Sequence, residues 1–161
     1  MSRPGNETRA GDSFMPALLD RLSRDSRGAI SRNAFRKTVL RDLVWLLNCT
    51  NLEGQLRLEE FPRVKRSVIN FGIPTLAGER LSESDLGAVA EGIKNAILCF
   101  EPRILEKSLK VTIAHGDDAS LYNRAHFRIE ATYWFEPYPI DMVIRAQWDM
   151  ETGGVEIREE R

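Results

Sequence analysis

The sequence has little of what secretion, disulfide bonding or membrane insertion requires. It contains only two cysteines, Cys49 and Cys99, among 161 residues. No apolar run approaches the roughly 20 residues that cross a bilayer, and Met1 to Asp12 lack the apolar core of a signal peptide. We therefore expect a cytoplasmic protein that does not insert into a membrane and keeps both cysteines as buried free thiols.

Residue types that bind metals or perform catalysis are equally scarce. There are only two histidines, His115 and His126. Asp117 and Asp118 follow His115, but a solvated hairpin fits this loop better than a cation site. The sequence also lacks Gly-x-Ser-x-Gly, His-Glu-x-x-His and Cys-x-x-Cys motifs and any phosphate-binding glycine loop. These absences predict a protein with no metal, no cofactor and no catalytic residues.

A peptidoglycan-cleaving glycosidase, similar to lysozyme, is the enzymatic alternative. Such an enzyme needs two carboxyl groups about 5 to 9.5 Å apart, one of them protonated before the reaction. Glu101, beside the aromatic Phe100, is the best acid in the sequence, but the nearby Arg103 favours its charged form. The other carboxylates fall mostly on polar helix faces, outward strand positions or loops, so we expect no enzymatic activity.

The net charge of −1 conceals two halves of opposite sign, since residues 1–75 carry a balance of +5 and residues 76–161 a balance of −6. Such halves suit a protein that presents different faces to different partners. The basic residues of the first half lack the interleaved aromatic side chains of a nucleic-acid-binding groove, so we expect protein partners and no nucleic acid. These basic residues include Arg57, Arg63, Lys65 and Arg66.

The chain begins with a polar stretch, which predicts a disordered tail over residues 1–13 and a single domain over residues 14–161. Leu18, Leu19 and Leu22 then recur at helical spacing after a proline, which predicts a short helix. This helix either packs on the body of the protein or forms an exposed docking segment.

Two longer amphipathic helices follow. The first spans residues 32–48, with Ser31 as its N-cap. The second begins with a capping box at Ser82 and ends near Phe100, because Pro102 cannot continue a helix. Their apolar stripes comprise Phe35, Val39, Leu40, Leu43, Val44 and Leu47 in the first helix, and Leu86, Val89, Ala90, Ile93, Ala96, Ile97 and Phe100 in the second.

The segment between these helices, residues 49–81, shows no regular period. It contains Gly72, which can adopt a positive φ angle, followed by a proline two residues later. We expect an ordered turn here that inserts Val68, Ile69 and Phe71 into the core.

The last third of the chain alternates apolar and polar residues, a pattern typical of half-buried antiparallel strands. Three such runs cover residues 109–114, 127–135 and 140–148, and a Gly-Gly turn leads to a short strand, Val155 to Arg158. The order predicts an α+β fold in which N-terminal amphipathic helices pack on one face of a C-terminal antiparallel β-meander. Its final strand leaves an open edge, where Val155 and Ile157 could pair with a strand from another protein.

Several stretches match a known family. They are Leu18–Leu22 (LLDRL), Val39–Asn48 (VLRDLVWLLN), Phe61–Val64 (FPRV), Ser67–Pro74 (SVINFGIP) and, most specifically, Ile97–Arg103 (ILCFEPR). On these motifs the chain resembles the TssE family, the small wedge subunits of type VI secretion baseplates. That family also covers the small wedge proteins of contractile phage tails, which are often labelled lysozyme-related.

The resemblance implies a structural subunit of a contractile injection machine, in the cytoplasm and docked at the inner membrane. Its implied partners are the baseplate proteins TssF, TssG and TssK and the sheath subunits TssB and TssC, whose assembly it would help to initiate. The implied partner-binding residues are Glu101, Pro102 and Arg103 at the wedge core, with Leu18, Leu19 and Arg21 on the short helix and Val155 and Ile157 on the last strand.

The resemblance leaves the role of Arg103 open, because this side chain could reach a partner or brace its own loop. Since the Glu-Pro-Arg motif follows the apolar stripe of its helix, we expect alanine at Glu101 or Arg103 to preserve the fold and weaken wedge assembly.

Overall fold

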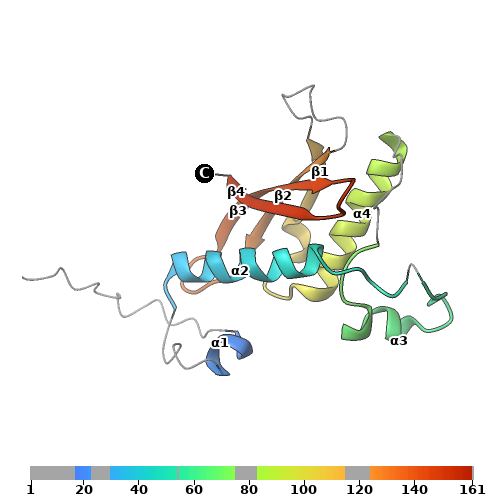
Figure 1. The fold of residues 1–161 in the computed structure, drawn as a ribbon. Helices are drawn as coiled ribbons and strands as arrows, with labels where there is room; N and C mark the ends of the chain where they lie inside the picture. Colours follow the sequence, from blue (N-terminus) through green and yellow to red (C-terminus); the bar gives the residue numbers. More distant parts are fainter. Residues whose placement is uncertain (1–16, 23–29, 54, 75–82, 115–123, 161) are drawn as a thin grey trace, which may run out of the picture.

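The computed structural model describes residues 17–22, 30–53, 55–74, 83–114 and 124–160. Helices occupy the first part of the chain and a four-stranded antiparallel sheet the last part, so the predicted α+β fold is confirmed (Figure 1). The predicted disordered tail, the capping residue Ser82 and the loop that contains His115 lie outside the described residues.

The helices are α1 (Leu18–Leu22), α2 (Arg32–Leu47), α3 (Pro62–Lys65) and α4 (Glu83–Phe100), with short 3₁₀ turns η1 (Val68–Asn70) and η2 (Glu106–Ser108). The predicted N-cap is confirmed, because Oγ of Ser31 accepts a hydrogen bond from the backbone N–H of Ala34 at 3.3 Å. The predicted end of α4 at Phe100 is confirmed as well, immediately before Pro102.

The sheet is a meander of β1 (Lys110–Ala114), β2 (Arg124–Tyr133), β3 (Ile140–Asp149) and β4 (Val155–Glu160), in that spatial order. β1 and β4 are therefore its two edges. Alternate side chains of β2 and β3 are buried and form one core cluster with α2 and α4, which confirms that the helices cover one sheet face. In this arrangement α2 packs beside β4 and α4 beside β1 (Figure 1).

The prediction that Val68 and Ile69 enter the core is wrong, since 81% and 66% of their surfaces are exposed. The buried residue of this turn is Asn70. Its Oδ1 accepts hydrogen bonds from the N–H groups of Leu52 and Glu53, both at 3.0 Å, and its Nδ2 donates to a third backbone group. Because one polar side chain satisfies three backbone groups, the turn is anchored without burying the two aliphatic residues beside it.

Gly72 has the predicted positive φ, at +122°. A Cβ atom here would lie 2.2 Å from the carbonyl oxygen of Cys49, so only glycine fits. The close approach lets the backbone N–H of Ile73 donate a 2.9 Å hydrogen bond to that same carbonyl.

The expectation that both free thiols are buried is wrong. Cys49 is exposed and Cys99 is half-buried.

Candidate functional site

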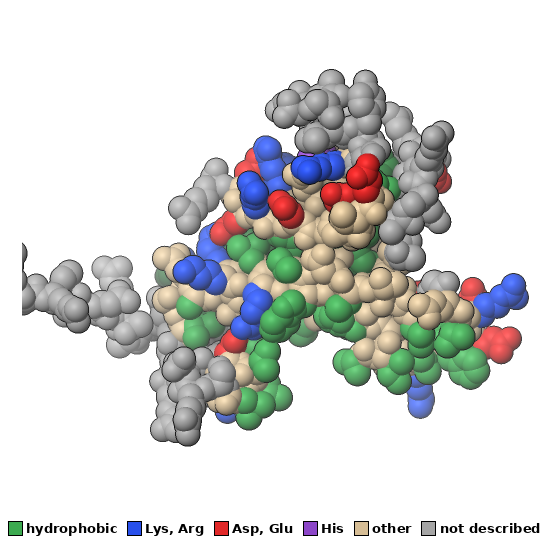
Figure 2. Space-filling view, in the orientation of Figure 1, with side chains coloured by type: hydrophobic (Ala, Val, Ile, Leu, Met, Phe, Trp, Pro, Cys, Tyr) green, Lys and Arg blue, Asp and Glu red, His purple; other side chains and the backbone are tan. Residues whose placement is uncertain are grey.

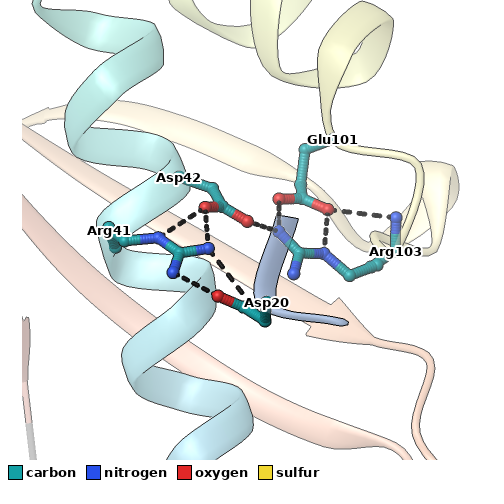
Figure 3. Close-up of polar contacts among 5 residues, drawn as sticks. All are labelled: Asp20, Arg41, Asp42, Glu101 and Arg103. Carbon is teal, nitrogen blue, oxygen red and sulfur yellow. Dashed lines mark hydrogen bonds and ion pairs between the residues drawn. The ribbon is translucent and has the colours of Figure 1, made fainter. Parts of the chain in front are cut away.

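The Glu-Pro-Arg motif forms an ion pair with itself directly after α4 (Figure 3). Glu101 still belongs to the last helical turn, since its N–H donates to the carbonyl of Ile97 at 2.8 Å. Pro102 then turns the chain, and the Arg103 side chain folds back onto the Glu101 carboxylate. Nε of Arg103 donates to Oε1 at 2.6 Å, Nη2 donates to Oε2, and the backbone N–H of Arg103 donates to Oε1 at 3.2 Å.

The same guanidinium joins α4 to α2. Nη2 of Arg103 donates to Oδ2 of Asp42 at 2.7 Å, and the other oxygen of Asp42 accepts from Arg41 at 2.8 Å. Arg41 in turn donates to Oδ1 of Asp20 on α1 at 2.6 Å. A continuous chain of alternating charges therefore connects three segments that are far apart in the sequence (Figure 3).

Burial separates this network from ordinary surface ion pairs. Only 4% of Glu101 and 18% of the Arg103 side chain are exposed. Burial lowers the pKa of Arg103, but the hydrogen bonds and negative charges of Glu101 and Asp42 outweigh it, so the pKa lies above its ordinary value. The nearby Tyr133 hydroxyl has a raised pKa, first because it is buried and second because Glu101 is negative.

The geometry revises the sequence interpretation that this motif follows the apolar stripe without belonging to the core. The Glu101 carboxylate points inward, so the expectation that the motif stands apart from the core is wrong for this residue. Arg103 braces its own loop through its contacts with Glu101 and Asp42.

A groove of about 440 Å³ lies against the network, between α1, α2 and the end of α4. Its exposed wall includes Leu19, with 53% of its surface exposed, and Trp45, over which the Arg41 guanidinium lies 4.8 Å from the ring centre. Figure 2 shows hydrophobic side chains gathered over α1, along the neighbouring side of α2 and around α3. The apolar residues of the groove are Ala17, Leu19, Leu43, Trp45, Leu46, Phe71, Phe100 and Pro102.

The structure brings some predicted site residues together and separates others. Leu19, Glu101, Pro102 and Arg103 all line the groove. Leu18 and Arg21 are exposed on α1 nearby. Val155 and Ile157 lie on β4, at the other side of α2, where Val155 is buried and Ile157 half-buried (Figure 1).

Asn48 is a site residue that the sequence interpretation missed. It ends α2, and its side-chain amide bonds both backbone groups of Val155: Nδ2 donates to the carbonyl and Oδ1 accepts from the N–H, each at 2.9 Å. Asp42 was also missed, although a signal was present. It follows Phe35 by seven residues, which places a carboxylate on the buried side of α2, where it needs a partner.

Comparison with known proteins gives one match. The family model described as baseplate wedge protein gp25 matches residues 33–138, about two thirds of the chain. The matched range includes nearly all of α2, with α4, β1, β2 and the Glu-Pro-Arg motif, and excludes α1, β3 and β4. Searches among curated proteins and among solved structures gave no match.

Proposed function

Since the chain belongs to the baseplate wedge protein gp25 family, we propose that it is a non-catalytic structural subunit of a type VI secretion baseplate. In this role it binds the wedge core formed by TssF, TssG and TssK, in the cytoplasm at the inner membrane. It also helps to initiate assembly of the TssB and TssC sheath.

One observation carries the wedge-binding part of the proposal: a preformed apolar groove backed by a buried ion-pair network. The floor of the groove is fixed by Arg103, which holds Glu101 and Asp42 in place before any partner arrives. A rigid site loses little conformational entropy on binding, so more of the apolar contact energy contributes to affinity. Glu101 and Arg103 thus position the groove, while Leu19 and Pro102 are available for contact.

The non-catalytic part of the proposal is supported by the state of Glu101, the best acid in the sequence. Its carboxylate accepts three hydrogen bonds from Arg103 and is buried, so it faces its own chain and not a substrate. Incubating purified protein with peptidoglycan in a zymogram or turbidity assay tests this part. Lysis that disappears in Glu101→Gln would overturn it.

The sheath-binding part rests on the open edge of β4. The backbone N–H of Asp149 donates a 2.9 Å hydrogen bond to the carbonyl of Gly154, so these two residues form a hydrogen-bonded pair at the start of the β3–β4 ladder. Hydrogen-bonded and non-hydrogen-bonded pairs alternate along an antiparallel ladder. The backbone groups of Val155, Ile157 and Glu159 therefore point away from β3. Asn48 already occupies those of Val155, so the edge offered to a sheath strand consists of Ile157 and Glu159.

The wedge proposal is tested by a pull-down of TssF, TssG and TssK with the full chain carrying Leu19→Ser. The matched control is Leu56→Ser, a leucine of nearly equal exposure (54%) that does not line the groove. We expect both variants to melt as the unmodified protein does and only Leu19→Ser to lose wedge binding. Equal retention by the two variants would contradict the groove as the wedge site.

The sheath proposal is tested with Ile157→Pro, which removes an outward N–H without breaking the ladder to β3. Ile157→Ala is the control, because it also removes most of the isoleucine side chain but keeps the backbone N–H of residue 157. We expect wedge binding by both variants and sheath polymerisation only on baseplates that carry Ile157→Ala. Normal sheaths on folded Ile157→Pro baseplates would exclude this edge.

A further inference from the structure

A second groove, of about 710 Å³, lies beside the open part of β4. It is lined by Arg32, Asn33, Arg36, Lys37 and Leu40 of α2 and by Glu159 and Glu160 of β4. Because it borders the outward edge of the strand, any strand that pairs with β4 would project side chains into it. The groove can therefore select which strand pairs there.

The contacts between α2 and β4 fix the order of side chains along this groove. Asn48 at the end of α2 meets Val155 at the start of β4, and Arg36 near the start of α2 forms an ion pair with Glu159 near the end of β4. The two elements thus run in opposite directions. Leu40, one turn from Arg36, lies between these contacts, so the groove is apolar near Ile157 and basic near Glu159.

The basic end keeps an excess of positive charge within the described structure. Glu159 neutralises Arg36, and Glu160 is engaged by Arg128 and Arg145. Arg32 and Lys37, in contrast, form no ion pair with any of the residues that the structure describes. Arg32 lies over the ring of Phe135, 5.8 Å from its centre, and this contact places no negative group beside the guanidinium.

We propose that this groove makes β4 selective for an acidic strand: the added strand places an apolar side chain opposite Ile157 and a carboxylate opposite Glu159, within reach of Arg32 and Lys37. Side chains paired with Ile157 and Glu159 lie on the helix-covered face of the sheet, because paired residues project to the same side. Asn48 ends the added strand by occupying the backbone groups of Val155. The inference rests on the proposed pairing of β4 with a sheath strand and adds the chemistry of that strand.

The experiment titrates the isotope-labelled full chain with two capped peptides and follows the backbone amide signals of Ile157 and Glu159 by NMR. The acidic peptide is Thr-Glu-Thr-Val-Thr-Glu-Thr, and the control replaces both glutamates with lysines. The acidic pattern reads the same in both directions, so valine can face Ile157 and glutamate can face Glu159 in parallel or antiparallel pairing. The variant is Arg32→Glu combined with Lys37→Glu, two exposed positions outside the core.

We expect the acidic peptide to shift both amide signals at about tenfold lower concentration than the lysine peptide, because the side chain opposite Glu159 gains a favourable charge contact when it is a carboxylate and meets repulsion from Arg32 and Lys37 when it is an ammonium group. In the Arg32→Glu, Lys37→Glu variant, the lysine peptide should act at a lower concentration than the acidic peptide. Equal effects of the two peptides, an unchanged order in the variant, or no shift of either signal at millimolar peptide would overturn the inference. Since the titration needs no wedge or sheath protein, it can succeed where the pull-down or the polymerisation assay fails.

Discussion

Replacing Glu101 by alanine should destabilise the fold itself. The substitution removes the carboxylate that accepts two side-chain hydrogen bonds and one backbone hydrogen bond from Arg103. The guanidinium then remains in a largely buried position with Asp42 as its only carboxylate neighbour among the residues described. Breaking a buried pair by removing one partner leaves a charge that neither water nor protein compensates fully.

The expected cost follows from this geometry. Loss of one member of a buried ion pair costs about 3 to 5 kcal/mol. The lower value applies here, because Asp42 still contacts Arg103 at 2.7 Å and the arginine is not completely buried. For a domain of this size about 1 kcal/mol corresponds to roughly 2 to 4 °C in Tm, so about 3 kcal/mol predicts a decrease of about 9 °C.

Thermal unfolding followed by circular dichroism measures this decrease, and Glu106→Ala is the matched control, since Glu106 is exposed and lies five residues further along the chain. A second comparison tests whether the loss of stability comes from the unpaired charge of Arg103. Glu101→Leu combined with Arg103→Met removes both charges, and we expect its stability to lie within about 1 kcal/mol of the unmodified protein. If Glu101→Ala melts within 2 °C of the control, the ion pair does not hold the loop and our reasoning about the groove floor fails.

Three further predictions use other features of the structure. Gly72→Ala should destabilise by more than about 3 kcal/mol in urea unfolding, because a Cβ would collide with the carbonyl of Cys49; an unchanged midpoint would contradict the close approach. Tyr133→Phe should stabilise by about 1 kcal/mol, since the buried hydroxyl has no hydrogen-bond partner in the part of the chain described; a clear loss of stability would show that the hydroxyl is satisfied. Arg145 first and Arg128 second lower the pKa of Glu160 below its ordinary 4.5, so this carboxylate stabilises the fold fully above pH 4.5 and loses that effect as the pH falls through the depressed value. The stability difference between unmodified protein and Glu160→Gln should therefore be present near neutral pH and vanish in strong acid, and a difference that persists in acid would refute this.

The sequence was sufficient for features that depend on local pattern. The 3.6-residue period predicted α2 and α4, proline predicted the end of α4 before Pro102, and strict alternation predicted the strands of the meander. The positive φ of Gly72 was predictable because glycine adopts that conformation without strain. Each of these inferences needed only neighbouring residues.

The remaining features depend on pairs that are distant in the sequence. Asp42 and Arg103 are 61 positions apart, and Asn48 and Val155 are 107 positions apart. No local pattern identifies such partners, so no role was assigned to Asp42 from the sequence and the edge of β4 was expected to be open at both Val155 and Ile157. The Val68 error has a different cause, since hydrophobicity does not reveal that a polar Asn70 anchors the same turn.

The contacts between α2 and β4 also determine the order in which the protein can fold. Arg36 and Glu159 are separated by 123 positions, whereas β2, β3 and β4 pair with their immediate neighbours in the chain. During synthesis α2 leaves the ribosome before residues 155–160 exist, so it cannot dock in its native position at that stage. Because local pairings form faster than long-range ones, we expect the sheet to form first and the docking of α2 to be the slow long-range step. A chain interrupted before β4 would leave Arg36 and Asn48 of α2 without their partners Glu159 and Val155, so we expect it to be more open to proteases and to aggregation.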